Sequence, residues 1–255
     1  MTRAASGSSA KGGRTIVIGD VHGCADELEA LLEKLALKRG DRLFLVGDLV
    51  VRGPSPNRVL QLVREVGGVA VCGNHEWRLL KWRELDSRRP KAKPALSEVD
   101  ERLLASKMLR STAADIDDEG WEQLERLPLW VEVPEHELLI VHAGLVPGVR
   151  LKKQTERNLL YMRGITSDGK PTEKRGAGVL WGKKYEGPMH VVFGHNARAT
   201  PQLHPFATGI DTGCVYGGRL TALVLPEARK VPRSVEARRK LLVSVKARRP
   251  YQAIK

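Results

Sequence analysis

The chain has 255 residues, which is enough for one large domain with a substantial hydrophobic core. Its 42% hydrophobic and 29% charged residues are typical of a soluble globular protein, and no apolar run approaches the roughly 18 residues of a membrane span. The three cysteines include no close pair, which argues against a disulfide framework or a thiolate zinc site and favours a cytoplasmic location. Residues 1–13, rich in Ser, Gly and Ala, predict a disordered leader.

The formal net charge of +13 is unevenly distributed. Residues 227–255 hold ten Lys or Arg and two acidic residues, so this predicted basic C-terminal extension alone carries +8. A contact with a polyanion or nucleic acid is one interpretation of such a segment, and a solvated tail that aids solubility is the simpler one. The charge agrees with a phosphate-rich partner but does not identify it.

The first 85 residues alternate short β-branched apolar runs with amphipathic segments. In the first amphipathic segment, Leu28, Leu31 and Leu35 recur at the spacing of one helix face. The alternation predicts a βαβαβ unit with parallel strands and right-handed crossovers. Its predicted strands are 16–18, 43–46 and 69–72, and its predicted helices are 25–37, 56–66 and 75–85.

A polar, Pro-punctuated connector at 87–94 ends this unit. Two helical patterns follow, at 97–109 and 118–127, and we interpret about 86–128 as a helical insertion that caps or flanks one domain. From residue 129 onward short strand patterns dominate, which predicts a second mixed or antiparallel sheet packed against the first. These strands are expected at 129–133, 137–141, 189–193, 220–225 and 241–245.

Residue types that ligate metals follow directly on five of the predicted strands. They are Asp20 and His22, Asp48, Asn74 and His75, His142, and His195. A single Gly-Asp or His after a strand is usually a turn or a packing residue. Five such clusters, all at the same end of their strands, instead predict one shared metal site at one edge of the sheets.

A binuclear hydrolytic site needs two cations about 3.5–4 Å apart and a carboxylate that bridges them. Asp20 and His22 stand two positions apart on one loop and suit a first metal. Asp48, on the loop after the next strand, is the natural bridging ligand.

The remaining clusters supply the second metal. Asn74, His142 and His195 can hold it, and His75 is left as a free imidazole. Oxygen and imidazole donors without a thiolate suit manganese, iron or zinc, and we take Mn²⁺ as the first choice.

These clusters resemble the ordered motifs of the phosphoprotein-phosphatase branch of the calcineurin-like metallophosphoesterases. The family pattern is G-D-x-H-G, G-D-x-x-x-R-G, G-N-H-E/D, H-x-G and a late G-H, and all five stand in order between residues 19 and 195. The resemblance implies an α/β protein, a four-layer α/β/β/α sandwich with two mixed sheets. It also implies a binuclear hydrolase domain, which we place at 14–226.

Two segments look most like the bacterial symmetrical diadenosine-tetraphosphate hydrolases of this branch. Residues 47–54 carry an apolar residue before the Arg and a Pro after the Gly, and residues 211–221 are similar to their D-T-G-C-x-x-G-G-x-L-T segment. The resemblance implies symmetrical cleavage into two ADP, with attack by a hydroxide that bridges the metals. It further implies that His75 protonates the leaving oxygen and that Arg52 and Arg163 clamp the phosphate.

One position departs from the protein phosphatases of the branch. Where they have an Asp that orients the catalytic His, this chain has Val51. Asp211 is a candidate to replace it.

Two alternatives keep the same site: a phosphoserine/phosphothreonine protein phosphatase, and a hydrolase that removes nucleotide caps from RNA 5′ ends. The expected partners are therefore a nucleotide polyphosphate or, in the alternatives, a phosphoprotein or capped RNA. A non-catalytic binding module would be expected to lack ligands, and none is missing. Aromatic residues near the motifs are interpreted as core rather than base-stacking residues: Trp77, Tyr161, Trp181 and Tyr216.

Overall fold

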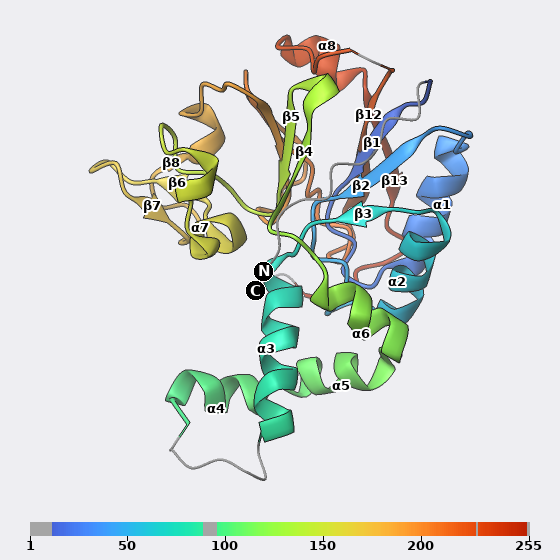
Figure 1. Ribbon diagram of the computed structural model, residues 1–255, viewed down its shortest axis with the longest axis vertical. Coiled ribbons are helices and arrows are strands. Elements are labelled where there is room, and N and C mark those ends of the chain that lie inside the picture. The colour runs from blue at the N-terminus through green and yellow to red at the C-terminus, as the bar shows by residue number, and fades with distance from the viewer. Residues whose placement is uncertain (1–11, 89–95, 228, 254–255) are drawn as a thin grey trace.

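The computed structural model describes residues 12–88, 96–227 and 229–253 (Figure 1). The predicted leader, 1–13, therefore lies almost wholly outside the described residues. The described residues form two five-stranded sheets and one small three-stranded sheet, with helices on the outer faces. Within the described ranges, no helix is both long enough and apolar enough to cross a membrane.

The first sheet has the order β13-β12-β1-β2-β3. β1 (Thr15–Ile18), β2 (Arg42–Leu45) and β3 (Val69–Ala70) are parallel, which confirms the parallel strands of the predicted βαβαβ unit. β12 (Arg219–Leu225) pairs antiparallel with β1, and β13 (Leu242–Lys246) adds the outer edge. The prediction that strands 220–225 and 241–245 belong to the second sheet is therefore wrong, because the chain returns to the first sheet after β11. Because β1, β2 and β3 run the same way, the ligand clusters that follow them meet at one edge of the sheet.

Two helices cover the outer face of this sheet, α1 (Ala25–Leu35) and α2 (Pro56–Glu65) (Figure 1). In α1, Leu28, Leu31 and Leu35 recur every three or four positions, and all are buried in the core shared with the sheet. The apolar face of α1 therefore positions the helix on the sheet.

The second sheet has the order β10-β11-β9-β5-β4. β4 (Trp130–Val133), β5 (Leu138–Val141) and β9 (His190–Phe193) lie within one residue of their predicted bounds. β10 (Gln202–Leu203) and β11 (Ala207–Gly209) complete the sheet and are not predicted by the sequence pattern. β5, β9 and β11 are parallel while β4 and β10 are antiparallel to their neighbours, so the sheet is mixed.

An outer layer beyond the second sheet is formed by α7 (Glu156–Tyr161) and the small sheet (Figure 1). The small sheet has the order β7-β6-β8, with β6 (Gly164–Ile165), β7 (Pro171–Thr172) and β8 (Val179–Leu180). Strands of two residues carry no readable alternation of apolar and polar side chains, so the sequence does not predict them.

Three hydrophobic cores fill the spaces between four layers. On β1, Ile16 and Ile18 pack in the core under α1, whereas Val17 packs between the two sheets. On β5, Ile140 faces the same core between the sheets and Val141 faces the outer layer. Strands buried on both faces appear in the sequence as continuous apolar runs. The predicted four-layer α/β/β/α sandwich is confirmed.

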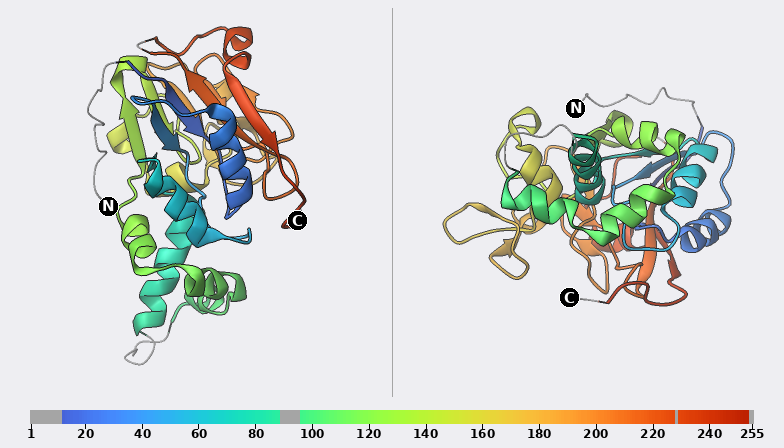
Figure 2. Two further views of the ribbon diagram at one scale, coloured as in Figure 1. Left: turned by 90° about the vertical axis from the view of Figure 1, so that its right-hand side faces the viewer. Right: turned by 90° about the horizontal axis from the view of Figure 1, so that it is seen from below.

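α3 (Asn74–Arg88) leads from the first sheet into a group of helices at one end of both sheets (Figure 2). The others are α4 (Glu98–Leu104), α5 (Lys107–Asp115) and α6 (Asp118–Glu125). The single helix predicted over 97–109 is two helices, because the Ser106 hydroxyl accepts the N–H of Leu109 and caps the start of α5. Residues 89–94 of the connector and residue 95 after it lie outside the described part.

Much of the predicted basic extension, 227–255, is part of the folded chain. It contains β13 and a short helix, α8 (Val235–Arg239). Arg238 of α8 is fully buried, and its guanidinium donates to four backbone carbonyl oxygens. Nearer the C-terminus, the hydroxyl of Tyr251 donates to the buried carboxylate of Glu27 in α1 at 2.9 Å. The basic residues of this segment therefore stand largely on folded structure.

Candidate metal centre

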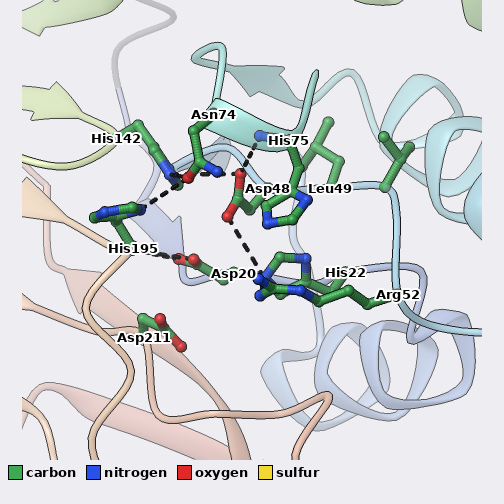
Figure 3. Close-up of polar contacts among 12 residues, drawn as sticks. Asp20, His22, Asp48, Leu49, Arg52, Asn74, His75, His142, His195 and Asp211 are labelled. Atoms are coloured by element: carbon green, nitrogen blue, oxygen red, sulfur yellow. Dashed lines mark hydrogen bonds and ion pairs between the residues drawn. The ribbon is translucent and has the colours of Figure 1, made fainter. Parts of the chain in front are cut away.

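The loops after β1, β2, β3, β5 and β9 bring the six predicted metal ligands into one cluster (Figure 3). The ligands are Asp20, His22, Asp48, Asn74, His142 and His195, of which all but His195 are almost completely buried. Four of them follow strands of the first sheet and two follow strands of the second. The cluster therefore exists only because the two sheets pack with these strand ends at the same edge.

Asp48 lies at the centre of the cluster. Its Oδ2 is 3.5 Å from His22 Nε2, and its Oδ1 is 3.4 Å from His142 Nε2. The backbone N–H of His75 donates to Oδ1 at 3.0 Å. Two sets of donor atoms, each within 4.8 Å of one another, share this carboxylate: one with His22 and His75, the other with His142 and His195. This is the place that a bridging carboxylate would occupy.

His142 is held with a lone pair facing other acceptors. Its Nδ1 is 2.8 Å from the carbonyl oxygen of Val46, which can only accept, so the ring proton is on Nδ1. Burial lowers the pKa of His142 to about 4, so the ring is neutral near pH 7. Nε2 then presents a lone pair to Asn74 Oδ1 at 3.0 Å and to the Asp48 carboxylate.

His195 repeats this arrangement. Its Nε2 is 3.1 Å from the carbonyl oxygen of Tyr161, so Nδ1 presents a lone pair to Asn74 Oδ1 at 2.8 Å. Turning over the Asn74 amide would give both rings a donor, but Asp48 would still face the lone pair of His142. A cation placed among these atoms satisfies all of them, and the hydrogen bonds to backbone carbonyls are those that orient imidazole ligands.

The hydrogen bonds and positive charges near the carboxylates of the cluster do not fully compensate their negative charge. Asp20 accepts the backbone N–H of His195 at 3.0 Å, yet burial, followed by the charges of Asp211 and Asp48, raises its pKa well above the usual range. Burial likewise raises the pKa of Asp48 to about 7. Divalent cations would remove this penalty, so the donor set fits a pair of such ions.

Glu76 is a structural residue of the site to which the sequence reading assigned no role. Its buried carboxylate accepts four backbone N–H groups, those of Asp48 and Gly73 on Oε2 and those of Leu49 and Val50 on Oε1, at 2.7–3.1 Å. One side chain from the first turn of α3 thus fixes the loop after β2 and the loop after β3 to each other. Its place in the motif, directly after His75, was the available signal.

The backbone is strained at this site. Of the seven non-glycine residues with positive φ in the described chain, five lie here: His22, Asp48, Val51, Arg52 and His195. A β-branched residue such as Val51, at φ 70°, rarely adopts this conformation. Such residues cost about 1–3 kcal/mol each and persist where the surrounding contacts impose them. The hydrogen bonds to Glu76 are contacts of that kind.

Arg52 and Arg163 stand beside the cluster and line a cavity of about 850 Å³ that His75 also lines. Arg52 Nη1 is 3.2 Å from His22 Nε2, and its guanidinium lies over the ring of Tyr216 at 5.5 Å. Arg163 Nη1 donates to the backbone carbonyl of His195 at 3.2 Å. All three residues predicted to be catalytic therefore face one solvent-accessible space next to the cluster.

The suggestion that Asp211 orients His75 is not supported. The Asp211 carboxylate accepts the N–H of Gly213 at 3.0 Å and lies on the side of the cluster away from His75 (Figure 3). Among the described residues, no hydrogen bond reaches the His75 ring, which contacts His22 edge-on with 5.0 Å between ring centroids. The strained Val51 is buried, and its side chain offers no acceptor in place of the missing Asp.

Two packed mixed sheets with carboxylate, amide and imidazole donors at their shared edge define a metallophosphoesterase, a class of metal-dependent hydrolase. The chain belongs to the calcineurin-like phosphoesterases, whose family model matches residues 13–209. Members of this family use binuclear metal sites.

Three of the proteins similar to this chain are named as tetraphosphatases. Asymmetrical bis(5'-nucleosyl)-tetraphosphatase PrpE of Halalkalibacterium halodurans is 35% identical over 229 residues, covering 83% of this chain and 89% of that protein. A symmetrical bis(5'-nucleosyl)-tetraphosphatase of Chromohalobacter salexigens is 30% identical over 271 residues, covering 83% and 94%. A solved structure of a protein provisionally identified as a diadenosine tetraphosphatase matches with a TM-score of 0.73. The two chains are 32% identical, and the match covers 92% of this chain and 94% of the other.

Proposed function

We propose that this hydrolase cleaves dinucleoside tetraphosphates, with diadenosine tetraphosphate as the representative substrate. The observation that carries the proposal is a cluster of cation-binding donors beside an arginine-lined cavity of about 850 Å³. The names of the relatives at 35% and 30% identity support this substrate class. The cytoplasmic location expected from the cysteine content stays a prediction.

We assign two divalent ions to the cluster, Mn²⁺ as the first choice and iron or zinc as alternatives. The proposed ligands, with Asp48 shared between the ions, are Asp20, His22, Asp48, Asn74, His142 and His195. The ions would supply Lewis-acid stabilisation of charge on the phosphoryl oxygens.

The protein side chains around the ions have separate proposed roles. Arg52 and Arg163 would bind non-bridging phosphate oxygens, because the planar guanidinium fork matches two oxygens at once. His75 lies outside the proposed ligand set and faces the cavity, so it is the group we assign to protonate the leaving oxygen. No carboxylate of the described residues holds its ring, so its orientation would depend on contacts with His22 and the substrate.

Which of the phosphoanhydride bonds is cleaved is a separate question. The segments at 47–54 and 211–221 predict symmetrical cleavage into two ADP. The relative at 35% identity is named asymmetrical, which favours ATP and AMP, and the relative at 30% identity is named symmetrical. We retain symmetrical cleavage as the hypothesis and asymmetrical cleavage as its direct competitor.

Product analysis tests both levels. Purified protein is incubated with Mn²⁺ and diadenosine tetraphosphate, with a parallel sample in EDTA, and the products are separated by anion-exchange chromatography. ADP alone would support symmetrical cleavage, and equal amounts of ATP and AMP would establish the asymmetrical reaction. No turnover of the dinucleotide by protein loaded with any of the three metals would overturn the proposed substrate.

The protein-phosphatase and RNA-cap alternatives use the same ligands. A comparison of kcat/KM on diadenosine tetraphosphate, a phosphoserine peptide and a short RNA with a nucleoside-tetraphosphate cap separates them. The proposal expects the free dinucleotide to have the highest value. A higher value for the peptide or the capped RNA would transfer the assignment to that substrate.

A further inference from the structure

Three more arginines line the cavity beyond Arg52 and Arg163, and no catalytic motif includes them. They are Arg78, Arg175 and Arg198, which we call the rim. Arg78 lies on α3, one helical turn after Asn74, whereas Arg175 lies between β7 and β8, and Arg198 follows His195 by three positions. Three separate segments thus direct cationic side chains to one space.

The rim arginines have no acidic partner in the parts of the chain that the structure describes. All three are exposed, and none of their guanidinium groups forms a salt bridge or a hydrogen bond with a described residue. The other described residues that line the cavity are neutral or basic, with no carboxylate among them. Other exposed arginines, such as Arg39 and Arg110, also form no salt bridge with a described residue, so the feature that distinguishes the rim is that its three arginines share one cavity.

Gathering like charges without partners costs free energy in the unliganded protein. Burial, followed by repulsion from Arg175, lowers the pKa of Arg163. Arg52 and Arg163 together already suffice to bind the non-bridging oxygens of one phosphoryl group, since each guanidinium fork binds two oxygens. The rim therefore provides positive charge that a phosphomonoester does not need.

We propose that Arg78, Arg175 and Arg198 bind the phosphates of a polyphosphate chain that lie beyond the phosphoryl group under attack. This inference rests on the proposed function and identifies the side chains that select the substrate class. A chain of four phosphates carries negative charge on every phosphate, so it can contact Arg52, Arg163 and the three rim arginines together. A phosphoserine or aryl phosphate ends after one phosphate and leaves the rim without a partner.

Kinetics on two substrates test the rim. The variants are Arg78→Ala, Arg175→Ala, Arg198→Ala and the triple variant, each assayed on diadenosine tetraphosphate and on para-nitrophenyl phosphate. We expect KM for the dinucleotide to rise roughly 3- to 10-fold for each single variant and at least about 100-fold for the triple variant, with kcat changing much less. The aryl phosphate reaction should lose far less than the dinucleotide reaction. Arg175→Lys, which keeps the charge but not the fork, should recover part of the loss.

The matched control is Arg102→Ala on α4, an arginine whose side chain is 82% exposed and does not line the cavity. It should leave both reactions as in the wild type. Equal losses on both substrates in the rim variants would show a general effect on the site and overturn the inference. So would an unchanged KM for the dinucleotide in the triple variant.

A binding measurement separates this inference from the proposed function. Inorganic tripolyphosphate should raise the melting temperature of the wild-type protein, and the triple variant should lose most of that rise. The rim predicts this even if the dinucleotide is not hydrolysed, so failure of the substrate assignment and failure of the rim are distinguishable. An equal rise in the wild type and the triple variant would contradict the role of the rim.

Discussion

The cluster of proposed ligands and the rim of the cavity are built in opposite ways. The proposed ligands sit at the ends of strands, are buried almost without exception, and contact one another or backbone groups within 2.8–3.5 Å. The rim arginines stand on a helix and two loops, are exposed, and have no bonded partner among the described residues. The first arrangement is held rigid by the protein, and the second is left to a ligand.

This difference assigns the chemical step to the cluster of proposed ligands and the selection of the substrate to the rim. A site that binds two metals needs its donors held in place, and here Glu76 and the packed sheets hold the loops that carry them. Substrate selection can be placed on exposed loops around that scaffold, where substitutions cost little stability. Substitutions in the ligand cluster should therefore abolish every reaction of the protein, whereas substitutions in the rim should change the order of preference among substrates.

The largest effect is expected for Asp48→Asn. The amide keeps the shape but loses the charge at the position shared by both donor sets, so metal binding and turnover of every substrate should fall to background. Metal content after reconstitution with Mn²⁺, measured by elemental analysis, and turnover of both test substrates check this. Asp118→Asn on exposed α6 is the control and should retain both. Two metals per chain in the Asp48 variant would contradict the bridging role.

His75→Ala should separate catalysis from metal binding. The imidazole is outside the proposed ligand set, so the variant should bind the same amount of metal while kcat falls by roughly 10²–10⁴-fold. The loss should be similar for para-nitrophenyl phosphate, whose leaving phenolate and a leaving nucleotide phosphate are bases of similar strength, and larger for a phosphoserine peptide, whose alkoxide is a far stronger base. Loss of one metal in this variant would make His75 a ligand, as its place in one of the two donor sets allows.

Glu76→Gln should destabilise the ligand loops. The amide NH₂ cannot accept, so two of the four buried N–H groups now bonded to the carboxylate would lose their acceptor. The free energy of unfolding should fall by about 2–6 kcal/mol, measured by urea denaturation in EDTA so that metal binding does not contribute. Glu122→Gln, at an exposed position of α6, should change it by less than about 1 kcal/mol. Equal effects of the two substitutions would remove the structural role assigned to Glu76.

Ionic strength should affect the two regions unequally and give the smallest change. Raising salt from about 0.05 M to about 0.5 M shortens the screening length to a few ångströms, which weakens exposed charge contacts more than buried ones. We expect kcat/KM for the dinucleotide to fall roughly 10-fold and that for the aryl phosphate by less than about 3-fold. Similar salt dependence for the two substrates would mean that the rim does not contact the polyphosphate chain.

The motifs in the sequence alone indicated the family, whose fold implied the four-layer architecture, and they predicted which residues meet at the proposed metal centre. The reason is local: each ligand follows directly on a short apolar run that must be a buried strand, and parallel strands deliver their carboxyl ends to one edge. The positions of Asp48, Asn74 and His142 could therefore be predicted without knowledge of long-range contacts. The same local reading missed β6, β7, β8, β10 and β11, whose two or three residues carry too little pattern to read.

Only the tertiary structure decided what surrounds those ligands. Glu76 joins the loops after β2 and β3, and Arg78, Arg175 and Arg198 gather from three separate segments. The sequence also did not indicate the left-handed backbone of Val51 or the absence of any bond from Asp211 to His75 among the described residues. Sequence spacing does not determine which exposed side chains share a cavity, because that depends on how loops from both sheets and the helical insertion pack. The sequence thus predicts the chemistry of this protein, whereas the arginines proposed to select its substrate are brought together only by the packing of its loops.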